Sequence, residues 1–90
     1  MTKTKSRPKE KTNLETSEIC NIILYNDDVN TFDFVIETLM EVCNHEYIQA
    51  VQCAHLVHHT GKCSVRRGSF KELKRKYEAM IDKGLSATIE

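Results

Sequence analysis

The sequence has no long apolar run. No stretch of its 90 residues approaches the roughly 18 consecutive apolar residues that a membrane-spanning helix needs. The N-terminal segment is rich in Lys and Thr, and it lacks the apolar stretch of a secretory signal peptide. We therefore expect a cytoplasmic protein that does not associate with a membrane.

The chain also lacks a Cys-x-x-Cys pair, a spacing found in many zinc and redox sites. Its four cysteines are widely separated, and the cytosol would keep them reduced. We interpret them as small apolar residues rather than as a disulfide framework. They are Cys20, Cys43, Cys53 and Cys63.

Signatures of catalysis are missing as well. Gly61 and Lys62 lack the upstream glycine and the following Ser or Thr of a phosphate-binding loop, and no G-x-S-x-G motif occurs. A chain of 90 residues is long enough for a single domain with one modest core, and leaves little room to enclose a substrate. We predict that the protein is not an enzyme and uses no cofactor.

The formal net charge of zero conceals an uneven distribution. Residues 1–12 carry five Lys or Arg, residues 13–60 carry eight acids and no Lys or Arg, and residues 61–90 carry eight bases and four acids. Up to residue 18, Leu14 is the only large aliphatic residue after Met1, too little apolar surface to offset the entropy of ordering this segment. We predict a flexible polar extension over residues 1–18 and a core domain over residues 19–90.

Apolar periodicity predicts six elements in the core domain. A β-branched run predicts a buried strand over residues 20–25, and helical spacing predicts a helix over residues 32–43 with Asn30 or Thr31 as its N-cap. A second helix is predicted over residues 47–59, ending before Gly61, and an alternating strand over residues 62–67. Ser69 can cap a third helix, which apolar residues between 70 and 81 mark and which ends at Gly84, before a last strand over residues 85–90.

This order, β-α-α-β-α-β, predicts a small α/β protein of the α+β type. Three short strands cannot bury their apolar residues alone, so the helices must pack on the sheet to form a single core. We expect a two-layer sandwich, in which a three-stranded antiparallel sheet packs against three helices. The pattern does not specify the order of the strands.

The histidine-rich segment over residues 52–63 allows a metal-binding interpretation. His55 and His59 lie four residues apart on one helix face, and Cys63 follows four residues later. A structural zinc site needs about four ligands, and the other candidates lie in different predicted elements. We therefore predict ordinary histidines and no metal site.

A basic cluster raises the possibility of nucleic-acid binding. Acidic residues interrupt it along the third helix, and no aromatic platform for base stacking lies beside it. A solvated surface is the simpler interpretation, but a small nucleic-acid-binding module stays as the alternative function. The residues are Arg66, Arg67, Lys71, Lys74, Arg75 and Lys76.

The polar segment Asn26, Asp27, Asp28 follows the first strand and suggests a cation site. Asn and Asp commonly stabilise turns through their own backbone, which is the structural alternative. Two carboxylates and an amide carbonyl could also bind an ammonium group. The second helix offers His58 beside the apolar Ala54 and Val57 on one face, and we expect that face to lie near the end of the first strand.

The motifs I-L-Y-N-D-D-x-x-T-x-x-F-V-I-x-x-L and V-H-x-x-G-K, with a final strand that opens with Leu, resemble the ClpS family of adaptors of the ATP-dependent Clp protease. The resemblance covers about residues 20–90. It implies recognition of N-degrons, the free first residues of proteins marked for degradation, and their delivery to the N-terminal domain of a ClpA-type or ClpC-type unfoldase. It also implies a monomer.

By that resemblance, Asn26 and His58 would bond to the α-ammonium group. Asp27 would bind it directly or through water, and Asp28 would help to hold the loop. The first side chain, typically Leu, Phe, Tyr or Trp, would enter a pocket formed by Asn30, Phe32, Val35, Ala54, Val57 and Leu85.

Several positions depart from the family pattern, among them Asn30 and Thr31, where Thr-Pro is common, and Phe32, which replaces a frequent Met. Ala54 stands where the family usually has a Met that guards the pocket entrance, which predicts a more permissive pocket. On the third helix the family docks its unfoldase with a Glu and a Lys. The Lys matches Lys76, whereas the position of the Glu falls at Lys71 or, with a shift in register, at Glu72.

Overall fold

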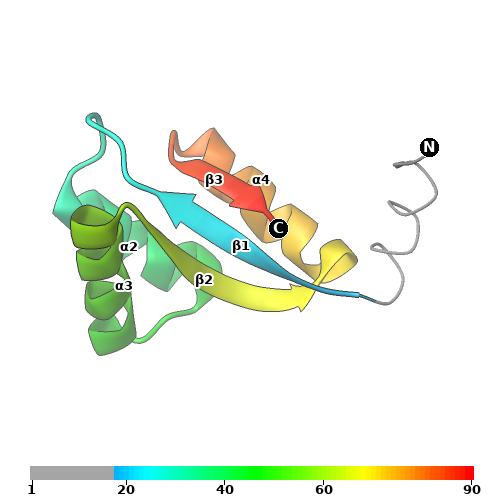
Figure 1. Cartoon of the computed structure of the whole chain (residues 1–90). Helices are drawn as coiled ribbons and strands as arrows, with labels where there is room; N and C mark the ends of the chain where they lie inside the picture. Colours follow the sequence, from blue (N-terminus) through cyan, green and yellow to red (C-terminus); the bar gives the residue numbers. More distant parts are fainter. Residues whose placement is uncertain (1–17) are drawn as a thin grey trace.

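The computed structural model of the chain describes residues 18–90, which form six elements (Figure 1). Their order is β1 (Ile19–Tyr25), α2 (Phe32–Cys43), α3 (Tyr47–Thr60), β2 (Lys62–Ser69), α4 (Phe70–Asp82) and β3 (Ser86–Ile89). The predicted element order is confirmed. The extension predicted for residues 1–18 lies, apart from Glu18, outside the described residues.

The three strands form one antiparallel sheet in the order β2-β1-β3. In the central strand β1, alternate side chains are buried, namely those of Cys20, Ile22 and Leu24. This alternation follows from the two-residue period of a strand with one face on the core. The predicted three-stranded antiparallel sheet is confirmed, and the apolar central strand accounts for the strand order.

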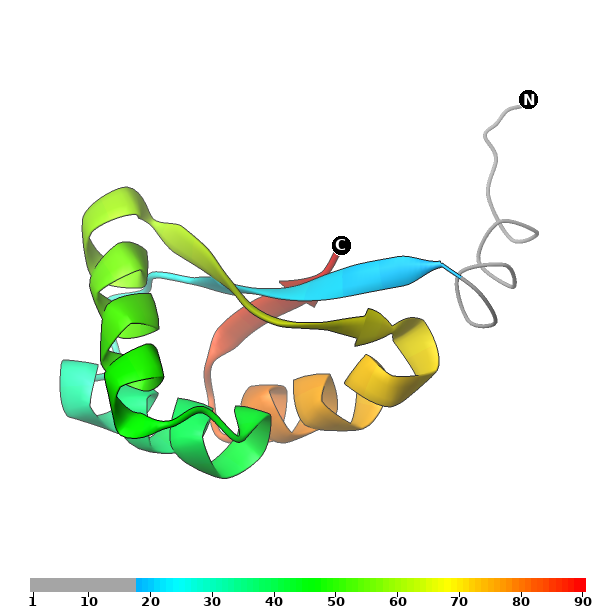
Figure 2. The same cartoon turned by 90° about the horizontal axis from the view of Figure 1, so that it is seen from below.

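All three helices lie on one side of the sheet, which gives the predicted two layers (Figure 2). Helix α4 runs along the sheet, whereas α2 and α3 pack against each other at the end where β1 stops and β2 begins (Figure 1). Leu39, Leu73 and Met80 are almost fully buried between the layers. Full burial of such a side chain contributes about 1.5–3 kcal/mol, so these contacts fix the helices on the sheet. Within residues 18–90, no helix has the length and apolar character to cross a membrane.

The helix ends show the capping chemistry that their residues favour. Of the two candidate N-caps for α2, Thr31 has the role, because its hydroxyl accepts a 3.1 Å hydrogen bond from the Phe34 amide. Helix α2 ends at Asn44 and α3 ends at Gly61, both in the left-handed region at φ of 60° and 97°. The short connection at Asn44 turns the chain so that α3 packs against α2.

Strand β2 is longer than predicted and contains an irregularity. It continues to Ser69 because Gly68 and Ser69 pair with the first residues of β1, whereas the sequence placed both outside the strand. The register shifts opposite Ile22 and Ile23, which leaves Val65 as an extra residue. The buried ring of His45 donates a 2.6 Å hydrogen bond from Nε2 to the Val65 carbonyl, so the bulge is tied to the α2–α3 connection.

The capping box of α4 provides a test of this fold. The Ser69 hydroxyl accepts from the Glu72 amide at 3.2 Å, and the Glu72 carboxylate accepts from the Ser69 amide at 2.9 Å. Ser69→Ala removes the first bond and should lower the free energy of unfolding by about 1 kcal/mol. Chemical denaturation measures this free energy. Lys74→Ala, on the exposed face of the same helix, is the control, and its free energy of unfolding should lie within about 0.5 kcal/mol of the parent value. Equal losses in both variants would contradict the assigned cap.

Candidate functional site

The polar segment after β1 lies beside the C-terminal end of α3. The amide of Asn26 donates a 2.9 Å hydrogen bond to the carbonyl of Gly61, the residue that terminates α3. The Gly61 amide in turn donates to Val57 at 3.0 Å. One backbone bond therefore brings Asn26 next to the last turn of α3, which carries His58.

Asp27 organises the loop between β1 and α2. One of its carboxylate oxygens accepts from the amides of Val29 and Asn30 at 2.9 and 2.8 Å. The other accepts from the Asn30 side chain at 2.9 Å and from the Ser86 hydroxyl at 3.3 Å. The Asn30 side chain also donates to the Gly84 carbonyl at 2.9 Å, so the loop is attached to the turn that precedes β3.

These bonds alter the ionisation of Asp27. Hydrogen bonds to a carboxylate favour its charged form, and the bond from the Asn30 amide is the largest contribution. The pKa of Asp27 is therefore lowered from its ordinary value of 3.8. The site keeps a negative charge at neutral pH.

The roles expected for the two aspartates are rearranged. From the resemblance, Asp28 was expected to help to hold the loop, whereas the hydrogen bonds that hold it are made by Asp27. Among the described residues, no hydrogen bond involves the side chains of Asn26, Asp28 or His58. These three groups are therefore available to a ligand.

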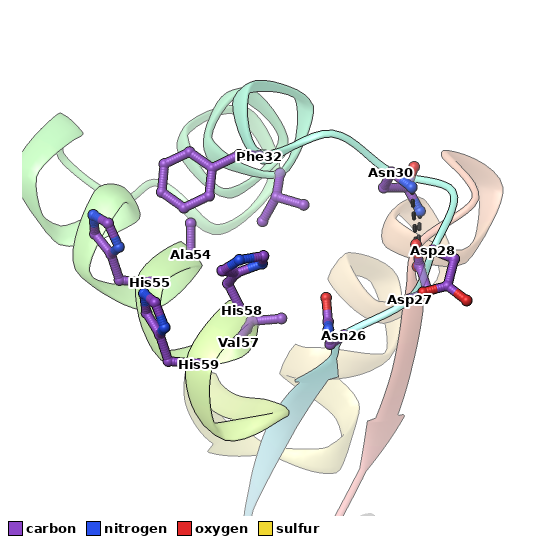
Figure 3. A pocket seen from close by; sticks show the side chains of 11 residues that line it. Asn26, Asp27, Asp28, Asn30, Phe32, Ala54, His55, Val57, His58 and His59 are labelled. Atoms are coloured by element: carbon purple, nitrogen blue, oxygen red, sulfur yellow. Dashed lines mark hydrogen bonds between the residues drawn. The ribbon is translucent and has the colours of Figure 1, made fainter.

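A cavity of about 580 Å³ opens beside this loop (Figure 3). Figure 3 shows Asn26 and His58 on either side of Val57, and Phe32 and Ala54 on the part of the wall formed by the helices. Almost all residues assigned to the site line this one cavity. The lining residues are Asn26, Asp27, Asp28, Asn30, Phe32, Val35, Ala54, His55, Val57, His58 and His59.

Leu85 is the assigned pocket residue that does not line the cavity. It is only 4% exposed, it belongs to the buried core, and its amide donates to the Met80 carbonyl at 3.1 Å. Its neighbour Gly84 reaches the site instead, through the bond from Asn30. Leu85 therefore supports the turn beneath the loop.

Two lining residues were not assigned to the pocket from the sequence. His55 and His59, considered there as metal ligands, line the cavity together with His58. Their rings are stacked, with centroids 5.7 Å apart. Within residues 18–90, no cluster of three or more His, Cys, Asp or Glu is arranged to hold a metal ion. The sequence feature that could have assigned His55 and His59 to the pocket is their four-residue spacing, which places both on the helix face beside the cavity.

The electrostatics of the cavity favour a positively charged ligand at one end. Asp27 and Asp28 contribute carboxylates, and no Lys or Arg is among the lining residues. The C-terminal end of α3 also carries partial negative charge from its free carbonyl groups. The helices contribute the apolar side chains of Phe32, Val35, Ala54 and Val57 beside the histidines, so the cavity suits a molecule with an ammonium group and an apolar substituent.

The basic residues have structural partners elsewhere. Lys76 donates to the Val42 carbonyl at 3.2 Å, and Arg66 donates to the Cys43 carbonyl at 3.3 Å. Both cations therefore satisfy carbonyl groups at the C-terminal end of α2, where positive charge is stabilising. Lys83 forms a 3.2 Å ion pair with Glu41.

A second hollow, of about 340 Å³, lies between α2 and α4. It contains two of the residues considered for docking a partner, Glu72 and Lys76, together with Arg75. Glu72 is engaged in the capping box, whereas Lys71 is exposed. No aromatic side chain is among the residues that line this hollow in the described part of the chain.

Comparisons with known proteins agree on one family. The model of the family described as ATP-dependent Clp protease adaptor protein ClpS matches residues 15–88. The ATP-dependent Clp protease adapter protein ClpS of Campylobacter jejuni (strain RM1221) is 40% identical over 57 residues, which are 63% of this chain and 59% of the relative. The ClpS of Streptomyces coelicolor is 32% identical over 68 residues, 76% of this chain and 71% of that protein. The chain therefore matches about three fifths of the length of the Campylobacter relative.

A solved structure has the same fold. The structure of Agrobacterium tumefaciens ClpS2 bound to L-phenylalaninamide superposes with a TM-score of 0.67 and covers 80% of this chain and 94% of that one. The two sequences are 20% identical, so this likeness concerns the fold.

The loop bonds of Asp27 predict a pH-dependent contribution to stability. Asp27→Asn should lower the free energy of unfolding by about 1 kcal/mol at pH 7, because the amide replaces a charged acceptor with a donor that faces Asn30. Because the pKa is lowered on folding, the contribution is complete above 3.8 and is lost as the pH falls through the folded value. Denaturant titrations of parent and variant from pH 7 to pH 2 should converge. A difference that does not change with pH would contradict this role, and Asp28→Asn serves as the control with little expected effect.

The bond from Lys76 to α2 predicts that this residue contributes to stability. Lys76→Met keeps the aliphatic length but removes the donor, so the free energy of unfolding should fall by about 0.5–1 kcal/mol. Lys71→Met on the same helix, exposed and without a hydrogen bond in the described part of the chain, should change it by less than about 0.5 kcal/mol. Thermal or chemical unfolding measures both, and indistinguishable variants would show that the Lys76 bond contributes nothing.

Proposed function

Because the chain belongs to the ClpS family of adaptor proteins of the ATP-dependent Clp protease, we propose that it recognises N-degrons. It binds the free α-amino group and the bulky apolar side chain of a first residue, and it delivers the bound protein to the N-terminal domain of a ClpA-type or ClpC-type unfoldase. It acts as a cytoplasmic monomer and catalyses no reaction. The observation that carries this proposal is a single cavity in which unpaired polar groups meet an apolar wall.

The polar end of the cavity suits an α-ammonium group. Such a group has three N–H donors and needs acceptors that are not already engaged. Three side-chain acceptors are candidates, because they have no hydrogen-bond partner among the described residues. They are the amide oxygen of Asn26, the carboxylate of Asp28 and a ring nitrogen of His58. Asp27 adds its charge from within the loop that it holds.

The apolar wall suits the first side chain. Phe32, Val35, Ala54 and Val57 line it, and Ala54 contributes only one methyl group. The volume of about 580 Å³ leaves room for Leu, Phe, Tyr or Trp. The ligand in the Agrobacterium tumefaciens structure, L-phenylalaninamide, has this combination of a free amine and an aromatic side chain. We expect the small Ala54 side chain to make the entrance permissive.

Delivery requires a second surface, for which α4 is the candidate. Lys71 is exposed there, and Lys76 and Glu72 border the hollow between α2 and α4. Because Lys76 and Glu72 also hold helix ends, Lys71 is the residue that can contact an unfoldase without loss of an internal bond. Docking variants should therefore begin with Lys71.

The hollow between α2 and α4 does not support the alternative nucleic-acid function. Arg66 and Lys76 are bonded to the end of α2, and Glu72 lies between Lys71 and the other bases of α4. The hollow beside Arg75 has no aromatic lining residue in the part of the chain that the structure describes. A base-stacking platform is therefore lacking there.

Binding of free-amine peptides tests the proposal. Fluorescence anisotropy should show that peptides beginning with Leu or Phe bind, and that acetyl-Leu binds at least about tenfold more weakly, because acetylation removes the charge and leaves acceptors unpaired. Asn26→Ala should weaken binding of the Leu peptide by about five- to 100-fold for the same reason.

The control variant changes a residue of the basic surface that the nucleic-acid hypothesis would use. Arg67→Ala alters an exposed base on β2 outside the cavity and should leave peptide affinity unchanged. If acetylated and free peptides bind equally well, the ammonium site is wrong. If Arg67→Ala weakens binding more than Asn26→Ala does, the ligand occupies the basic surface instead.

A further inference from the structure

A row of three histidines forms the side of the cavity opposite the loop. His55, His58 and His59 come from the last two turns of α3, and all three line the cavity. Figure 3 shows His55 and His59 at the outer end of the row, on the far side of Ala54 and His58 from Asn26 and the aspartates. The proposed ammonium site uses only His58, so His55 and His59 have no role in it.

The rings of the outer pair are held in place by one another. His55 lies 4.9 Å from Phe32 between centroids in an edge contact, and it stacks on His59 at 5.7 Å with planes 9° apart. His59 also makes an edge contact with His58 at 5.1 Å. Within residues 18–90, neither His55 nor His59 uses a ring nitrogen in a hydrogen bond. The N–H groups of both rings are therefore available to donate hydrogen bonds to a ligand.

The outer histidines border the cavity at the end away from Asn26 and the aspartates, where a chain anchored by its first residue can leave. In the proposed complex the ammonium group lies near Asn26 and the first side chain packs against the apolar wall. The Cα atom of the second residue then lies about 3.8 Å from that of the first. On the loop side, Asn30 donates to both carboxylate oxygens of Asp27, so this side of the cavity is held in one conformation. We propose, on the basis of the proposed function, that His55 and His59 form a subsite for the second residue of the N-degron and that this subsite selects an acidic side chain.

The charge distribution supports an acidic second residue. Carboxylates lie on the loop side of the cavity, histidines lie on the helix side, and no other ionisable side chain is among the lining residues. A neutral imidazole donates one N–H and a protonated one donates two, whereas a carboxylate only accepts. A glutamate or aspartate at the second position therefore matches the row, and a lysine does not.

Peptides that differ only at the second residue test the subsite. Three labelled peptides with Leu first and Glu, Gln or Lys second are titrated by fluorescence anisotropy at pH 6.5 and low salt. The Glu peptide should bind about two- to five-fold more tightly than the Gln peptide, as expected for a solvent-exposed charged contact, and the Lys peptide should bind most weakly. The double variant His55→Gln, His59→Gln should bind the Glu and Gln peptides equally.

The controls separate the subsite from the rest of the site. Gln52→Ala, also exposed on α3 but outside the cavity, should keep the preference for Glu. Equal affinities of the three peptides for the parent protein, a preference for Gln or Lys, or a preference that survives the double variant would each overturn the subsite while leaving the first-residue site intact. If no free-amine peptide binds, the proposed function fails and the subsite fails with it.

Discussion

The carboxylate of Asp27 holds the loop that forms one side of the cavity. It fixes the loop after β1 through the amides of Val29 and Asn30, and it reaches the start of β3 through Ser86. The side chain of Asn30 extends the same connection to Gly84. Segments from the first and last strands thus share one acceptor, and they can share it only while the carboxylate is charged. The cavity therefore depends on an interaction that also supplies part of its negative potential.

Neighbouring polar residues of the loop have different roles, because some hold the structure and others are available to a ligand. The Asp27 carboxylate accepts four internal bonds, whereas the side chains of its neighbours Asn26 and Asp28 make none in the described part of the chain. A polar group that is exposed and unpaired contributes little to stability, but it can bind a ligand without first breaking an internal bond. The loop is in this sense preorganised for a cation. The same division occurs on α4, where Lys76 holds the end of α2 and Lys71 faces solvent.

Most of the fold followed from local patterns. The β-branched run of β1, the helical spacing of the apolar residues in α2 and the N-cap Ser69 are short-range signals, and each was interpreted correctly from neighbouring residues. The sequence left the N-cap of α2 open between Asn30 and Thr31, and the errors lay at strand ends. Strand β2 extends to Ser69 because it pairs with the start of β1, about 50 positions away in the chain, and no local pattern contains that information.

For the site, the sequence determined the chemical types and the tertiary structure decided their roles. Ala54, Val57 and His58 could be grouped from spacing alone, because helix geometry places residues three and four apart on one face. The Asn26 segment was joined to them by the expected packing of that face near the end of the first strand. Which aspartate holds the loop depends on the donors that the fold brings to it, and Ser86 is 59 residues from Asp27. Leu85 was assigned to the pocket and is buried in the core, whereas His55 and His59 line the cavity. Residue type and periodicity are encoded locally, but exposure to a cavity is a property of all the elements that surround it, and only their packing decides it.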